Sequence, residues 1–166
     1  MRLQLKDVFS LANALCGFLA LALFFIFGFA SSFALLLLAV LFDYFDGRIA
    51  RKGSASNEFG KQIDSLSDAV SFGAVPAALV LFQHYPGTPV AFFAVLLGGL
   101  FYVAAVIVRL AEYNLQKEKG FYYGLPCPFA ALLLLLFGWF EWRIAVFALF
   151  ALGILMLSKF RLKKVF

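Results

Sequence analysis

The sequence predicts an all-α integral membrane protein, a bundle of six transmembrane helices with a short N-terminal interfacial segment. Of the 166 residues, 64% are hydrophobic and only 14% are charged, whereas soluble domains are roughly half apolar. At about 20 residues for each spanning helix, this length accommodates six helices and short loops in a single membrane domain, residues 1–166. The net charge of +5 fits the basic loops of membrane proteins, and we expect no binding to nucleic acid.

The first two helices are expected to be joined by a short polar turn. Residues 1–7 alternate apolar and polar side chains and should lie along the lipid headgroups. A helix is predicted over residues 8–29, where Asn13 is compatible with an interhelical hydrogen bond or with a ligand contact. The turn Ala30 to Ser32 then leads into a second helix over residues 33–52.

The third helix is predicted over residues 58–83, after a loop rich in Gly and Ser. Pro76 should kink it, which a packed membrane bundle tolerates. The only histidine, His84, follows in a turn and is expected to be a surface residue, because one ligand does not make a metal site.

Three further helices, over residues 90–114, 126–140 and 143–158, complete the predicted bundle. A polar loop separates the fourth from the fifth, and a basic tail follows the sixth. Cys16 and Cys127 lie in apolar segments without CxxC spacing, so they indicate neither a zinc site nor a disulfide framework.

The basic residues predict the orientation of the bundle in the cell membrane. With six helices, 13 of the 14 Lys and Arg residues lie on the side of the two termini, and only Arg143 lies opposite. Because basic loops stay in the cytoplasm, we expect both termini and the loop between the second and third helices to be cytoplasmic.

Four of the chain's five aspartates lie between residues 43 and 68, next to apolar runs, where an unpaired carboxylate is costly and usually functional. Asp43 and Asp46 are three residues apart, and Asp64 and Asp68 are four apart, so each pair lies on one helix face. If the two helices are antiparallel neighbours, the carboxylates converge and repel one another unless cations intervene. Ligation by oxygen alone favours Mg²⁺, Mn²⁺ or Ca²⁺, and two ions would suit phosphoryl transfer.

The residues around the aspartates favour an anionic ligand such as a diphosphate. Gly47, Ala50 and Gly60 are small and allow a substrate to approach the backbone. Basic residues, of which Arg51 is the strongest candidate, border the same stretch, although loop charges that set membrane topology explain many of them.

Eight positions of this stretch form a spaced pattern: Asp43, Asp46, Gly47, Ala50, Arg51, Gly60, Asp64 and Asp68. This pattern resembles the complete signature of the CDP-alcohol phosphotransferases, a family of six-helix membrane enzymes that usually work as homodimers. The resemblance implies transfer of a phosphatidyl-type group from a CDP-linked lipid to an alcohol, with release of CMP. It also implies that the four aspartates bind Mg²⁺ or Mn²⁺, that Asp68 is the general base, and that Gly47, Ala50, Arg51 and Gly60 border the CDP group.

Segments outside the signature are similar to the phosphatidylserine synthase branch of this family: NALCGFLA at 13–20, DSLSDAVSFGAVPA at 64–77, RLAEYN at 109–114 and GLPCPFA at 124–130. The resemblance implies L-serine as acceptor and CDP-diacylglycerol or CDP-archaeol as donor. Because serine carries a carboxylate, Arg109 is the candidate for that group or for the lipid phosphate, and snorkelling to the interface is its alternative role. Asn114, Ser71 and Asn13 are weaker candidates for polar contacts.

Two alternatives remain open at this stage. The same chemistry could use another acceptor, glycerol 3-phosphate or an inositol phosphate, whose extra charge predicts a second basic cluster. A cation transporter using the aspartates as its ion site is an alternative of another class. Transporter sites usually lie near the bilayer midplane, whereas these aspartates are predicted near the helix ends.

Overall fold

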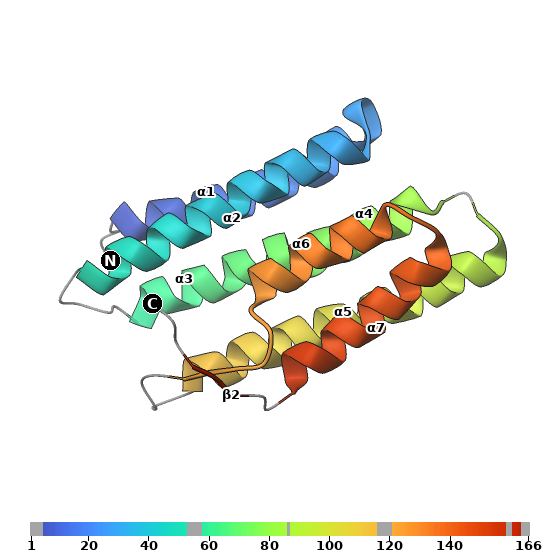
Figure 1. Cartoon of the computed structure of the whole chain (residues 1–166). Coiled ribbons are helices and arrows are strands. Elements are labelled where there is room, and N and C mark those ends of the chain that lie inside the picture. The colour runs from blue at the N-terminus through green and yellow to red at the C-terminus, as the bar shows by residue number, and fades with distance from the viewer. Residues whose placement is uncertain (1–4, 53–57, 86, 116–120, 159–160, 164–166) are drawn as a thin grey trace.

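The computed structural model describes residues 5–52, 58–85, 87–115, 121–158 and 161–163. Within these ranges the chain forms an elongated helical bundle with helix axes running side by side (Figure 1), and the prediction of an all-α membrane fold is confirmed. The elements are α1 (Leu5–Phe27), α2 (Phe29–Lys52), α3 (Glu58–Asp68), a π-helical turn η1 (Ala69–Ala74), α4 (Val75–Gln83), α5 (Pro89–Leu115), β1 (Phe121–Tyr123), α6 (Cys127–Gly138), α7 (Trp142–Leu157) and β2 (Arg161–Lys163).

The turn between α1 and α2 is made by Gly28, and the expected turn at Ala30 to Ser32 is wrong. Gly28 has a φ of 78°, a left-handed conformation that glycine adopts without strain. The two serines are accommodated inside the helix, because Ser31 Oγ donates to the Gly28 carbonyl at 2.7 Å and Ser32 Oγ donates to the Ala20 carbonyl at 2.7 Å. A single glycine therefore reverses the chain.

The helix from Glu58 to Gln83 occupies the centre of the bundle. It packs against α1 on one side, α5 on another and α6 on a third, and Figure 1 shows it between the α1–α2 pair and the α5–α7 pair. The irregularity expected at Pro76 takes the form of η1, one wide turn placed directly before the proline. This turn begins at the residue after Asp68, so it influences the direction of the candidate site residues.

Two segments expected to be loop and tail pair as short strands. Phe121 to Tyr123 lies antiparallel to Arg161 to Lys163, at the end of the bundle where α1 and α3 begin (Figure 1). Aromatic residues favour extended backbone, but the pairing itself requires α5 and α7 to end near each other. Sequence periodicity does not contain that information.

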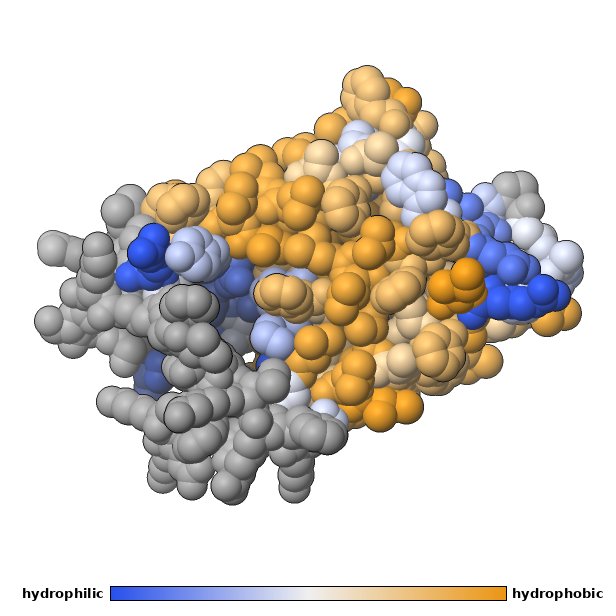
Figure 2. Space-filling view, in the orientation of Figure 1, coloured by the Kyte–Doolittle hydropathy of each residue, from blue (hydrophilic) through white to orange (hydrophobic). Residues whose placement is uncertain are grey.

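The surface has the character of a membrane protein. Figure 2 shows a broad apolar band between two more polar ends, and Phe25, Ile26 and Phe147 are each at least two-thirds exposed. Among the described residues, three helices are long and apolar enough to cross a membrane, at residues 7–27, 58–83 and 89–115, and three shorter apolar helices accompany them. Large exposed apolar side chains are favourable in lipid and costly in water.

Candidate active site

Three of the four predicted aspartates converge in the structure. Asp43 comes from α2, and Asp64 and Asp68 come from α3, one turn apart on the same face. One carboxylate oxygen of each lies within 4.8 Å of the others. Two oxygens bound to one hard cation lie no further apart than about twice the metal–oxygen distance of 2.0–2.6 Å, so the three oxygens fit a shared divalent ion.

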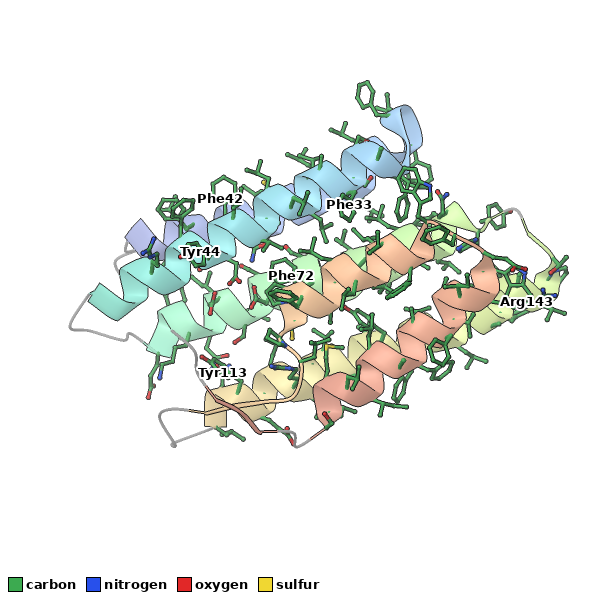
Figure 3. All side chains as sticks on the ribbon, in the orientation of Figure 1. Phe33, Phe42, Tyr44, Phe72, Tyr113 and Arg143 are labelled. Carbon is green, nitrogen blue, oxygen red and sulfur yellow. The ribbon has the colours of Figure 1, made fainter. Side chains whose placement is uncertain are left out.

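The site lies at the end of the bundle where α1 and α3 begin and α2 ends. Figure 3 labels Tyr44, the residue next to Asp43 on α2, at this end of the bundle. Asp43 and Asp64 are partly exposed, whereas Asp68 is 8% exposed. The cluster thus opens toward the polar end of the protein while its innermost carboxylate reaches into the bundle.

Asp68 is held by a side chain from the first helix. The amide nitrogen Nδ2 of Asn13 donates a hydrogen bond of 3.0 Å to Oδ1 of Asp68. Asn13 is fully buried, and its carbonyl oxygen Oδ1 has no hydrogen-bond partner among the described residues. A buried polar atom without a partner costs about 1–3 kcal/mol, which makes this oxygen an exceptional feature of the site.

Helix α1 approaches the π-helical turn very closely beside this contact. Ser71 Oγ donates a 3.0 Å hydrogen bond to the backbone carbonyl of Asn13. At Gly17, a Cβ atom would lie 2.6 Å from Ser71 Oγ and 3.0 Å from Ser71 Cα. Ser71, expected as a weak acceptor contact, therefore bonds to α1 and joins the two helices beside the carboxylates.

The start of α1 differs from the predicted interfacial segment. The helix begins at Leu5, and Asp7 is fully buried. Asp7, Ser10 and Asn13 follow at intervals of three residues and are all buried, so they form one polar face. Sequence reasoning missed Asp7 and Ser10, although this spacing in an apolar helix was the available signal.

Arg109 is buried and is anchored to the backbone. It is 7% exposed, and its Nε donates a 2.5 Å hydrogen bond to the Leu125 carbonyl. The Cys127 thiol at the start of α6 experiences the charges of Arg109, Asp68 and Asp43, so the guanidinium and the carboxylates lie in one electrostatic environment. Snorkelling to the interface, the alternative role of Arg109, does not describe this buried side chain.

The connection that Arg109 holds is fixed at a second point. Gly124 has a φ of 70°, and a Cβ there would collide with the Met156 carbonyl. The Leu125 amide donates a 3.3 Å hydrogen bond to the Leu155 carbonyl. The segment before α6 is thus held by hydrogen bonds to Arg109 and to the end of α7.

Of the remaining predicted site residues, the structure describes the surroundings of some but not of others. Asn114 Nδ2 donates a 2.8 Å hydrogen bond to Ser65 Oγ, next to Asp64. Gly60 is buried, and Gly47 is exposed with no atom within 4 Å of an added Cβ, which leaves room beside the aspartates. The side chains of Asp46, Ala50 and Arg51 lie outside the described part of the protein.

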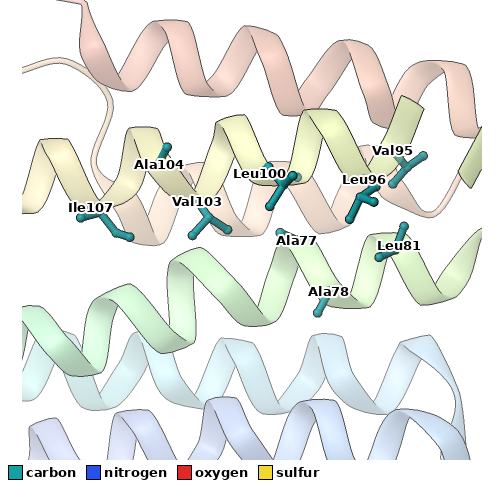
Figure 4. A pocket seen from close by; sticks show the side chains of 10 residues that line it. Ala77, Ala78, Leu81, Val95, Leu96, Leu100, Val103, Ala104 and Ile107 are labelled. Carbon is teal, nitrogen blue, oxygen red and sulfur yellow. The ribbon is translucent and has the colours of Figure 1, made fainter. Parts of the chain in front are cut away.

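A separate groove of about 360 Å³ lies between α4 and α5 (Figure 4). Its lining is entirely apolar and consists of Ala77, Ala78, Leu81, Val95, Leu96, Gly99, Leu100, Val103, Ala104 and Ile107. It contains none of the candidate polar residues, so it has no chemistry with which to bind a nucleotide or an amino acid.

Comparisons with known proteins agree with the aspartate signature. The family model described as CDP-alcohol phosphatidyltransferase matches residues 3–160. A Methanocaldococcus jannaschii protein named CDP-diacylglycerol-serine O-phosphatidyltransferase is 35% identical over 132 residues, which cover 80% of this chain and 59% of that relative. A Methanothermobacter thermautotrophicus protein named archaetidylserine synthase is 35% identical over 98% of this chain and 71% of its own length.

A third relative, from Bacillus subtilis, also bears the name CDP-diacylglycerol-serine O-phosphatidyltransferase. It is 29% identical over 155 residues, or 92% of this chain and 85% of its own length. The chain therefore spans most of the Bacillus subtilis relative, but only about three-fifths of the Methanocaldococcus protein.

Proposed function

Because this chain belongs to the CDP-alcohol phosphatidyltransferase family, we propose that it transfers a phosphatidyl or archaetidyl group from a CDP-linked lipid to the hydroxyl of L-serine and releases CMP. The observation that carries the proposal is the convergence of Asp43, Asp64 and Asp68 at a polar end of a membrane bundle. The names of the three relatives support serine as the acceptor. Such a site lets an apolar lipid donor meet a water-soluble acceptor.

Asp43, Asp64 and Asp68, with Asp46, would hold Mg²⁺ or Mn²⁺, and two ions are proposed. The fit rests on three carboxylate oxygens within 4.8 Å of one another and on a donor set of oxygen alone, which suits hard cations. The bound ions would neutralise the negative charge of the diphosphate. The partial exposure of Asp43 and Asp64 leaves them accessible to the ion from the polar side.

Asp68 is proposed as the general base. Its carboxylate takes the proton from the acceptor hydroxyl while the hydroxyl oxygen attacks the phosphorus on the lipid side of the diphosphate. A new oxygen–phosphorus bond forms, the bond from that phosphorus to the CMP oxygen breaks, and CMP leaves. The hydrogen bond from Asn13 holds Oδ1 of Asp68, which favours a defined geometry for proton transfer.

The two substrates are assigned to two different sets of residues. Gly47, Ala50, Arg51 and Gly60 would line the CDP group, as the family resemblance implies, and the open space at Gly47 is compatible with this role. The candidates for the acceptor or the lipid phosphate are Arg109, Asn114, Ser71 and Asn13. Arg109 has the charge that a carboxylate or a phosphate requires.

We also propose that the protein works as a homodimer in the cell membrane with its aspartate end facing the cytoplasm. The distribution of basic residues supports this orientation. The donor would be CDP-diacylglycerol or CDP-archaeol, since relatives named for each lipid class are similarly close.

An acceptor screen by CMP release tests the function. Purified protein in detergent is given a CDP-lipid, Mg²⁺ or Mn²⁺, and serine, glycerol 3-phosphate or inositol phosphate in parallel. We expect CMP and a serine lipid with serine, and neither product after chelation of the metal. Product with another alcohol and none with serine would overturn the choice of acceptor, and no CMP with any alcohol would overturn the reaction class.

A further inference from the structure

We propose that Asn13 recognises the ammonium group of the acceptor through its side-chain carbonyl oxygen, while its amide nitrogen holds Asp68. The inference rests on the proposed function and deepens it, because it assigns one substrate group to one atom. It would make Asn13 a residue that selects amino alcohols over other alcohols.

The orientation of the Asn13 amide is determined by its neighbour. Nδ2 is 3.0 Å from Oδ1 of Asp68, and a carboxylate accepts hydrogen bonds but does not donate them when ionised. Rotating the amide by half a turn would place two oxygens against each other. The NH₂ group therefore faces Asp68, and Oδ1 faces away from that contact.

The exposed fraction of Asn13 is 0%, and Oδ1 has no hydrogen-bond partner among the described residues. Buried polar atoms in folded proteins are nearly always hydrogen-bonded, and the exceptions mark functional sites or bound molecules. This atom is the second observation, independent of the aspartate cluster, that indicates a bound ligand. It requires a donor.

The chemistry of the proposed reactants limits which group can donate a hydrogen bond to Asn13 Oδ1. The diphosphate and the serine carboxylate offer only acceptor oxygens, so Asn13 Oδ1 would repel them. Ribose hydroxyls and the serine ammonium can donate. The neighbouring Asp68 carboxylate favours the cation over a neutral hydroxyl, because an ammonium gains from both the amide dipole and the negative charge.

The spacing of serine's functional groups matches this assignment. Its hydroxyl and ammonium lie on adjacent carbons, so a hydroxyl directed at Asp68 brings the ammonium within a few ångströms of the same carboxylate. Asn13 Nδ2 and Oδ1 lie on one carbon, about 2 Å apart by covalent geometry. One residue can thus contact Asp68 with one atom and the neighbouring substrate group with the other.

The packing of α1 keeps Asn13 in place. Ser71 Oγ donates to the Asn13 backbone carbonyl at 3.0 Å, and Gly17 allows α1 to approach Ser71 closely. Because this backbone is held before any ligand binds, the side-chain carbonyl is preorganised for recognition.

The test compares serine with 3-hydroxypropionate, which is serine with hydrogen in place of the ammonium group. The kcat/KM ratio of the two acceptors is measured by CMP release, with 3-hydroxypropionate also used as a competitor of serine. The variants are Asn13→Leu, which keeps the size of the side chain, and Asn13→Ala, which does not need to fit into the space that Asn13 occupies. Cys16→Ala, a buried change one turn further along α1, is the control.

We expect the kcat/KM preference for serine to fall about 10-fold or more in both variants, Asn13→Leu and Asn13→Ala, because each loses one hydrogen bond to a charged group. Cys16→Ala should retain the wild-type ratio. Asn13→Asp keeps an oxygen but loses the NH₂ donor, so it should retain the preference while kcat falls for both acceptors.

An unchanged ratio with an equal loss of kcat for both acceptors would overturn the proposal and leave Asn13 with a role in positioning Asp68. An unchanged ratio with a raised KM for the CDP-lipid would also overturn it, in favour of a ribose contact. If the wild-type protein makes no serine lipid, the proposed function itself is wrong, and this result is obtained before any variant is compared.

Discussion

The hydroxyl of Tyr102 on α5 donates a 3.0 Å hydrogen bond to the backbone carbonyl of Phe72, the residue four positions before Pro76. A proline has no N–H, so the carbonyl four residues earlier loses its usual helical donor. Tyr102 is fully buried and provides a donor from a neighbouring helix. The π-helical turn next to Asp68 is thus stabilised by a contact between α5 and the central helix.

Tyr102→Phe should lower the free energy of unfolding by about 1–2 kcal/mol, because a buried carbonyl loses its donor while the ring is kept. Thermal unfolding in detergent measures the change. Tyr85→Phe, whose side chain is 63% exposed, is the matched control and should unfold like the wild type. Equal behaviour of the two variants would show that the Tyr102 hydroxyl contributes nothing to this turn.

Gly17→Ala should destabilise the protein by about 1–3 kcal/mol through overpacking. The added Cβ would lie 3.0 Å from Ser71 Cα, so α1 and the π-helical turn must separate. CMP release should fall with stability, because the separation moves Asn13 relative to Asp68. At Gly99 an added Cβ meets only Ala77 Cβ at 3.7 Å, so Gly99→Ala should have little effect on either measurement.

Asp68→Asn should reduce CMP release by about 10²–10⁴-fold if this residue is the general base, while largely sparing CDP-lipid binding. Asp64→Asn removes a charged oxygen ligand from the cluster and should raise the Mg²⁺ or Mn²⁺ concentration needed for half-maximal rate. Metal titration of both variants separates the two roles. Rates restored in Asp68→Asn by added metal would contradict the assignment of Asp68 as base.

Arg109→Lys should lower stability by about 1–2 kcal/mol, because lysine cannot reproduce the bond from Nε to the Leu125 carbonyl. If the guanidinium also binds the acceptor carboxylate, the KM for serine should rise while the KM for the CDP-lipid stays unchanged. The control is Arg143→Lys, at a side chain that is 71% exposed. A rise confined to the KM for the CDP-lipid would show that Arg109 binds the CDP-lipid and not serine.

We expect the stability of the protein to depend on pH through His84, which follows α4 at the end of the bundle opposite the aspartates. It is only partly exposed, and burial lowers the pKa of its imidazole from the ordinary value of 6.5. The unfolded chain therefore binds the proton more readily, so the stability that neutral His84 contributes is complete above pH 6.5 and is lost as the pH falls from 6.5 through the lower pKa of the folded protein. Thermal unfolding across mildly acidic pH should show a smaller loss in His84→Gln than in the wild type.

Much of the fold follows from local pattern. The apolar runs predict the helices because burial in lipid requires a continuous apolar surface about one bilayer long. The helical spacing of Asp64 and Asp68 predicts one shared face, and the structure shows both carboxylates in the cluster with Asp43. The tight turn at Gly28 was missed, because helix propensity does not distinguish a polar serine turn from one glycine with positive φ.

By itself, the sequence determined the membrane class of this protein, its family signature and the acidic residues available to a metal. Those properties depend on composition and short-range spacing. Only the tertiary structure decided that Asn13 meets Asp68, across 55 residues of chain, and that Arg109 is anchored to Leu125. Such contacts depend on the rotation and separation of packed helices, which result from the interlocking of many side chains at once and leave no periodic trace along the chain.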